Sequence, residues 1–253
     1  TAMKHKRFAA VVLAAALLLT GCGGAAAPAA PAGSGAASQS AAAAAVQTAQ
    51  KERITDQWSL EKTVRGEMIG VMKLSIHVPQ LVCDSPDAAA LNEELAAMYA
   101  AEYMDYESDP DAEVPQGEEC SQTEINWDAY WYGDCVSLVV SSCYGGTDAP
   151  FHNGWCFDFE SGNQLTATQL LQRMGADPAA LEEALYRDVK RRDELDRQTA
   201  CERGLLPPGS LKEGNTAWWA TLDELPLLFD EAGNVTFFVR RFSASREEYV
   251  NDA

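Results

Sequence analysis

The sequence predicts an α+β fold, an antiparallel β-sheet meander packed by two main α-helices in a single globular head. Several segments alternate apolar and polar residues with a period of two, and two segments repeat apolar residues at helical spacing. Turn residues separate these segments, and nothing repeats at a fixed period, which excludes a solenoid. We expect the head to span residues 53–253, after two N-terminal segments of different composition.

Residues 1–22 have the pattern of a bacterial lipoprotein signal peptide. A basic start precedes an apolar run over residues 8–19, which is too short to span a bilayer comfortably. The sequence Leu-Thr-Gly-Cys that ends at Cys22 resembles a lipobox, so we expect lipid on Cys22. Paired acyl chains would anchor the protein stably to the extracytoplasmic face of the cell membrane. The alternative is an ordinary secretory signal with an incidental cysteine.

Residues 23–52 are predicted to form a disordered tether. Up to residue 50 the segment is almost wholly Ala, Gly, Pro and Ser, which offer few side chains to bury. Coil statistics give such a length a mean reach of roughly 30 Å. The tether would therefore lift the head away from the membrane.

The head is expected to open with two strands, residues 57–64 and 71–78, followed by a helix. In the second strand Ile76 faces the core, while His77 faces outward. The helix begins at Ser85, because a proline follows at the favoured first position. Its apolar residues recur at helical spacing: Leu91, Leu95, Met98 and Tyr99.

Residues 105–119 carry seven carboxylates and no basic residue. Their order lacks the EF-hand pattern of calcium ligands. We interpret the segment as a solvated acidic loop. The alternatives are a docking surface for a basic protein and an adventitious Ca²⁺ site.

Residues 120–132, 135–144 and 151–160 are predicted to be consecutive strands of the antiparallel meander. Alternation gives the sheet a buried aromatic face on one side. We expect three side chains of that face to share one interior: Trp127, Trp155 and Phe157.

The opposite face of the meander supplies candidate ligand contacts. Two tyrosines beside an aspartate would stack a sugar there, although exposed tyrosines are also common on strands. A histidine further on, with Asp148 and Asp158 near it, is the best local cluster for catalysis, and it fits a hydrogen-bonded polar edge equally well. The candidate binding residues are Asp128, Tyr130, Tyr132, Asp148 and His152.

Residues 134–171 resemble a known bacterial domain. The pattern is a strand, Tyr-Gly-Gly, a strand ending in Phe-Asp-Phe-Glu-Ser-Gly-Asn-Gln-Leu-Thr, and a Leu-Leu helix. It resembles the RsiV-like extracytoplasmic domain of unknown function, which forms the outer half of a lysozyme-sensing anti-sigma factor and also sits beside a polysaccharide deacetylase. The resemblance extends more weakly to residues 73–81 and 231–234. Family members often have a histidine soon after the Gly-Gly pair, where this chain has Thr147 and Asp148.

Capping signals mark two further helices. Thr166 and Gln169 have the spacing of a capping box, and Asp177 opens the longest helix. We expect this amphipathic helix to lie on the sheet with its charged face in solvent. That charged face carries Arg191, Asp193 and Asp196. Short strands are predicted at residues 218–222, 225–229 and 235–242.

Apart from the lipid-bearing cysteine, six cysteines suggest disulfides in an exported head. Fifteen pairings are open, but Cys135 and Cys143 lie about 27 Å apart along one strand and cannot pair. Cys120 is expected near Cys143, and Cys156 near either strand cysteine. Free thiols and a zinc site are the alternatives, the latter without a C-x₂-C or paired histidines. The candidate disulfide cysteines are Cys83, Cys120, Cys135, Cys143, Cys156 and Cys201.

The net charge and the absence of catalytic motifs limit the classes of function that the sequence allows. The formal charge is −19, from 19 basic and 38 acidic residues, and it becomes −22 once the three basic residues of the leader are removed. Such a chain repels nucleic acid and attracts cationic partners. It has no G-x-S-x-G or H-E-x-x-H motif. We therefore predict no catalytic residues, no metal and no cofactor.

The expected protein is a membrane-anchored extracytoplasmic lipoprotein with a non-enzymatic binding or sensing head. The resemblance implies lysozyme, a cationic protein, or a cell-envelope component such as cell-wall material as its ligand. The alternatives are a cell-wall hydrolase or sugar-modifying enzyme, and a purely structural envelope lipoprotein.

Overall fold

The fold comes from a computed structural model of the chain. The predicted signal peptide, nearly all of the tether and Asp148 lie outside the described residues, so the predictions for Cys22 and for the tether stay predictions. The structure describes residues 50, 52–66, 70–114, 116, 120–145, 147, 149–207, 221–230, 233–246 and 248–252.

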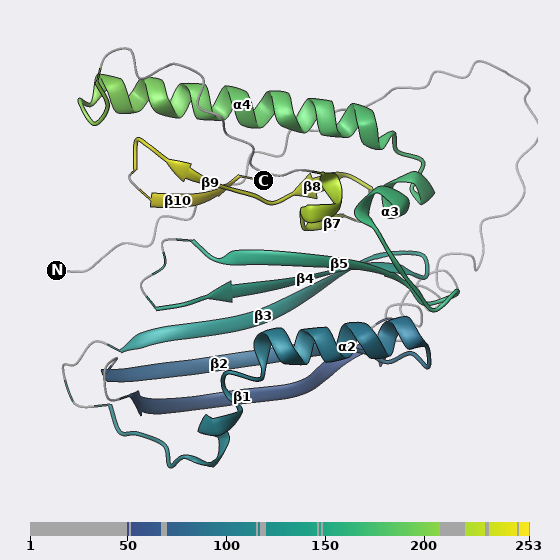
Figure 1. Ribbon diagram of the computed structural model, residues 1–253, viewed down its shortest axis with the longest axis vertical. Helices are drawn as coiled ribbons and strands as arrows, with labels where there is room; N and C mark the ends of the chain where they lie inside the picture. The colour runs from purple at the N-terminus through teal and green to yellow at the C-terminus, as the bar shows by residue number, and fades with distance from the viewer. Residues whose placement is uncertain are drawn as a thin grey trace, which may run out of the picture. The chain divides into compact units, whose positions relative to one another are not determined.

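A six-stranded sheet forms the centre of the head (Figure 1). The strands lie side by side in the order in which they occur along the chain. Every neighbouring pair is antiparallel except β2 with β3, which run parallel with Ile76 opposite Ile125. The α+β class is therefore confirmed, but the sheet is mixed. The strands are β1 (Ile54–Gly66), β2 (Gly70–Leu81), β3 (Ser121–Tyr132), β4 (Cys135–Cys143), β5 (Phe151–Asp158) and β6 (Asn163–Leu165).

The parallel pair follows from the connection between β2 and β3. A parallel neighbour needs a crossover of a dozen or more residues, usually containing a helix. Here the crossover holds helix α2 (Pro86–Tyr99), the short 3₁₀ helix η1 (Met104–Ser108) and the acidic segment. The chain thus returns to the end of the sheet at which β2 began before it enters β3.

The predicted helix starts are confirmed. Ser85 Oγ accepts the Ala88 N–H at 3.1 Å in front of α2. Thr166 and Gln169 form the reciprocal capping box of α3 (Ala167–Arg173). Asp177 caps α4 (Pro178–Glu202), the longest helix described.

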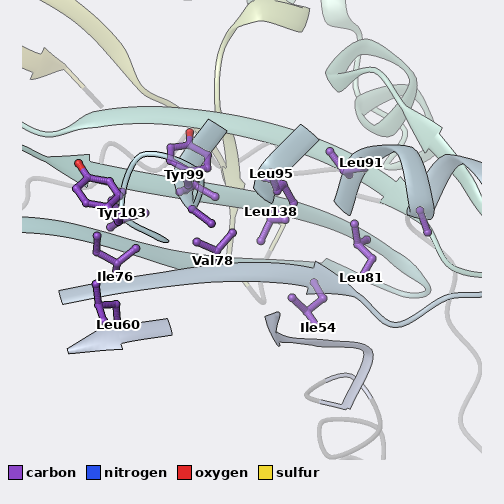
Figure 2. Close-up of a cluster of buried hydrophobic side chains, with 14 of the residues drawn as sticks. Ile54, Leu60, Ile76, Val78, Leu81, Leu91, Leu95, Tyr99, Tyr103 and Leu138 are labelled. Carbon is purple, nitrogen blue, oxygen red and sulfur yellow. The ribbon is translucent and has the colours of Figure 1, made fainter. Parts of the chain in front are cut away.

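One face of the sheet packs against α2. Figure 2 shows Leu91, Leu95 and Tyr99 of the helix pointing toward strand residues such as Ile76 and Val78, all of which are buried. The tryptophans of β3 and β5 and Phe157 join this cluster, and Phe157 is 1% exposed. The predicted shared interior of Trp127, Trp155 and Phe157 is confirmed.

The opposite face of β4 and β5 is covered by a second hydrophobic cluster. It contains α3, Val189 of α4, and the short strands β7 (Leu227–Phe229), β8 (Val235–Phe237) and β9 (Val239–Ser243), the last paired with β10 (Glu248–Asp252). Residues 218–220 of the strand expected at 218–222 lie outside the described residues, and its last residue, Leu222, begins a 3₁₀ helix, η2 (Leu222–Glu224). The strand expected at 235–242 is corrected, because it is interrupted at Phe238, whose N–H donates to Pro226 O.

The position of α4 also corrects a prediction. The helix contacts β9 and α3 instead of lying on the six-stranded sheet. Its charged face is only partly in solvent, because Asp193 is buried and the Asp196 side chain is 10% exposed. Asp196 accepts hydrogen bonds from the Ser243 hydroxyl and the Ala244 N–H, at 2.8 and 2.7 Å. The aspartate therefore binds the turn between β9 and β10.

Gly154 allows the second cluster to approach β5. A Cβ at this position would lie 2.7 Å from Pro226 Cα, and main-chain atoms cannot yield as a flexible side chain would. We expect Gly154→Ala to lower the free energy of unfolding by about 2 kcal/mol through overpacking. Urea denaturation measures this change, and an unchanged midpoint would contradict the close contact.

Candidate functional site

The tyrosines proposed as a sugar platform lie against another part of the same chain. The Phe229 ring of β7 packs edge-on against Tyr130 and Tyr132, with centroids 6.4 and 6.5 Å away. Tyr130 belongs to the second cluster, and burial, together with the charge of Asp128, raises the pKa of its hydroxyl. Of the three residues proposed to contact a sugar, Tyr132 and Asp128 are exposed and Tyr130 is half-buried. The Tyr130 ring is thus engaged in packing.

His152 is also held by intramolecular contacts. Its ring stacks on Phe238, with centroids 4.1 Å apart and planes 14° apart, and its Nδ1 lies 2.8 Å from Ser141 Oγ. Burial, and then the charge of Arg240, lowers the pKa of His152, so the imidazole is neutral at neutral pH. The residue joins β5 to the C-terminal strands.

Asp158 does not meet His152. The two residues lie six positions apart on β5, and Asp158 pairs with Cys135 while His152 pairs with Ser141. Asp158 accepts from the Arg173 guanidinium and the Ser161 hydroxyl, each at 2.6 Å. Burial acts to raise the pKa of Asp158, but these hydrogen bonds outweigh it and hold the pKa at about 2. Its position is that of a structural turn carboxylate.

The exposed polar surface of the head lies on β1, β2 and β3, on the face opposite α2. Register places Glu61 beside Ser75, and Ser75 beside Glu124. Asp128 lies further along β3, which makes it the sequence-predicted candidate that belongs to this surface. We call it the open face; its side chains, all exposed or half-buried, are Ser59, Glu61, Thr63, Arg65, Lys73, Ser75, His77, Gln122, Glu124, Asn126 and Asp128.

His77 is the best-connected residue of the open face. Its Nδ1 lies 2.9 Å from Asp56 Oδ2, and its Nε2 lies 3.0 Å from Glu61 Oε1. Each carboxylate has a second partner, since Ser75 Oγ donates to Glu61 and Trp127 Nε1 donates to Asp56, both at 2.6 Å. The network thus joins all three strands.

Asp56 and Glu61 were not singled out from the sequence. Alternation alone predicted an outward His77, but its partners come from β1, where a β-bulge between Asp56 and Trp58 shifts the register. No signal in the sequence marks that bulge. The complementary charges on neighbouring strands were the one indication that could have suggested the contact.

The acidic segment borders one edge of the open face. Its residues lie along β1: Lys62 Nζ donates to Glu107 O at 2.9 Å, and the Ala112 N–H donates to Thr63 O at 2.8 Å. A hollow of about 440 Å³ lies between this segment and the sheet. Its lining residues are Glu61, Lys62, Thr63, Lys73, Leu74, Ser75, Asp111, Ala112 and Gln122. The described part of the segment is therefore attached to the sheet and presents Asp111 to this hollow.

The six cysteines are free thiols, which contradicts the predicted disulfides. The strand register explains the difference. Cys156 pairs with Ser137, so it is only a diagonal neighbour of Cys135, and Cys143 pairs with Glu124. Diagonal neighbours in a sheet lie about 7–8 Å apart, beyond the usual span of a disulfide.

Negative charge is concentrated in the part of the chain that forms the sheet and α2. Residues 52–172 contain 22 acidic and 4 basic residues, a formal balance of −18, whereas residues 173–253 contain 16 acidic and 11 basic residues, a balance of −5. Nowhere in the described residues do three or more His, Cys, Asp or Glu side chains gather as ligands for a metal ion. Among the described helices, none has both the length and the apolar composition needed to span a membrane.

Comparison with known proteins adds no relative. No protein-family model matches this chain, and a search of curated proteins finds no match either.

Proposed function

We propose that the head is a non-enzymatic binding or sensing domain that captures a cationic protein on the open face. The observation that carries the proposal is the gathering of Glu61 on β1 with Glu124 and Asp128 on β3, all exposed or half-buried on one face, with Asp56 beside them. The lysine and arginine side chains of this face are Lys73 and Arg65, and Arg65 donates to Glu113 O. A surface on which charges of one sign predominate attracts an oppositely charged partner and speeds its association.

The rest of the sheet supports this choice of surface. Hydrophobic clusters occupy the α2 side of the sheet and the other side of β4 and β5, so large apolar surfaces there are already buried. The −18 balance of residues 52–172 extends the attraction beyond the face itself. A strongly basic extracytoplasmic protein such as lysozyme has the complementary charge.

The resemblance of residues 134–171 to the RsiV-like domain remains part of the proposal, as does the lipid anchor at Cys22. Together they describe a sensor held on the outer surface of the cell membrane, where lysozyme and cell-wall material are present. In this setting the acidic head would recognise its ligand by charge and strand geometry, without chemical conversion.

The direct test is calorimetric titration of lysozyme into the head at low salt. We expect Glu124→Gln combined with Asp128→Asn to weaken binding about tenfold, because two charges that face the partner are lost. The matched control is Glu93→Gln combined with Glu194→Gln, which makes the same change in net charge at exposed positions on α2 and α4. Equal loss in both variants, or no binding by the unmodified head, would contradict the proposal.

A further inference from the structure

We propose that His77 regulates the open face through its own charge. The neutral imidazole leaves the face at its full negative charge and favours capture of a cationic partner, whereas the imidazolium reduces that charge and weakens capture. This inference rests on the proposed function and deepens it.

The contacts of the imidazole ring are the basis of the inference. Both ring nitrogens face carboxylate oxygens, those of Asp56 at 2.9 Å and Glu61 at 3.0 Å. Only the imidazolium can donate from both nitrogens, because the neutral ring has one N–H and one lone pair. Loss of the proton therefore turns one of the two contacts into a repulsion between acceptors and releases a carboxylate for another cation.

The residues around His77 limit the effect of its protonation to the imidazole and its two carboxylate partners. Ser75 Oγ still donates to Glu61 and Trp127 Nε1 still donates to Asp56 whichever form the ring takes, so the carboxylates remain in place. The charged side chains around His77 come from all three strands. They are Asp56 and Glu61 on β1, Lys73 on β2, and Glu124 and Asp128 on β3. Among these residue types only histidine ordinarily titrates between about pH 6 and pH 8.

The direction of the effect follows from linkage. The hydrogen bond to Asp56 raises the pKa of His77, burial acts against it, and Glu61 raises it further, so the pKa lies above its ordinary value of 6.5. The stabilising contribution of His77 is thus fully present below pH 6.5 and is lost as the pH rises through the raised pKa. A cationic ligand repels the imidazolium, so binding expels its proton. Affinity then rises with pH, by at most tenfold per pH unit for one proton.

The experiment uses an N-acetylated ten-residue arginine peptide, because arginine keeps its charge throughout this pH range whereas a free α-amino group would titrate within it. Titrations at low salt and about pH 6 and pH 8 should show affinity for the unmodified head rising by about three- to tenfold. Calorimetry in two buffers of different ionisation enthalpy should show that binding releases protons. In His77→Gln the affinity should be the same at both pH values, and no proton should be released.

His152→Gln is the matched control, because it removes the other histidine in the described part of the chain and should leave the pH dependence intact. Circular dichroism melting verifies that each variant is folded. A pH-independent affinity of the unmodified head, or a rise that persists in His77→Gln, would overturn this inference and leave the proposed function standing. Failure of both lysozyme and the arginine peptide to bind would overturn the two together.

Discussion

Replacing Phe157 with alanine is expected to lower the free energy of unfolding by about 4 kcal/mol, or about a thousandfold in the folding equilibrium. Phe157 lies at the centre of the first cluster, is 1% exposed, and packs edge-on against Phe159 with ring centroids 5.1 Å apart. Truncation removes its buried apolar surface and leaves a cavity between the sheet and α2. Urea denaturation followed by tryptophan fluorescence measures the change.

Phe159→Ala is the control for this prediction. Phe159 follows β5 and is half-buried; its ring stacks on Trp131 and lies 5.3 Å from the Arg53 guanidinium. Because part of this ring is already hydrated, its loss should cost less than half as much. Equal destabilisation by the two variants would show that the interior is not centred on Phe157.

Asp196→Ala should have the second largest effect, a loss of about 3 kcal/mol. The carboxylate accepts from the hydroxyls of Ser243 and Ser245, from the Ala244 N–H, and from Arg241 at 3.4 Å. Removal takes this acceptor from the buried Ser243 and Ser245 hydroxyls and from the Ala244 N–H, and dehydrated donors are costly. Hydrogen exchange should then show the turn between β9 and β10 opening more readily than in the unmodified protein.

A control variant and the pH dependence of stability test the proposed role of Asp196. Glu194→Ala on the exposed side of α4 should change stability by no more than about 0.5 kcal/mol. Burial acts to raise the pKa of Asp196, but hydrogen bonds from Ser245, Ser243 and Ala244 outweigh it and the pKa is lowered. Its contribution is therefore present above the ordinary aspartate pKa and is lost as the pH falls through the lowered value. An Asp196→Ala variant as stable as the original would refute the buried role.

Elements that depend on neighbouring residues were predicted well. The capping box at Thr166 and Gln169 requires only four consecutive residues, and it forms as expected. The aromatic face of β3 and β5 depends on alternation along each strand, and its residues share one interior. Both signals are local, so no knowledge of the distant chain is needed to interpret them.

Features that depend on register were predicted poorly. The parallel pairing of β2 with β3, the absence of disulfides among the described cysteines, and the contact of α4 with β9 all depend on which distant segments become neighbours. A shift of two residues in one hairpin decides whether two cysteines can meet. Composition and periodicity contain no such information.

The candidate site shows the same division. Sequence alternation identified Asp128 as outward and predicted the outward face of His77, and both lie on the open face. It also selected Tyr130 and His152, which the C-terminal strands cover with Phe229 and Phe238. The covering segment lies far from them in the chain, so their burial could not be inferred from their own strands.

Composition and the order of nearby residues were sufficient to predict the α+β class, the starts of the helices, the apolar side of the central strands and the excess of negative charge. They could not show which polar side remains exposed or which carboxylates hold His77. Those outcomes depend on packing between distant segments. The C-terminal strands cover β4 and β5 on the side of the sheet opposite α2, and the bulge in β1 brings Asp56 within hydrogen-bonding distance of the imidazole.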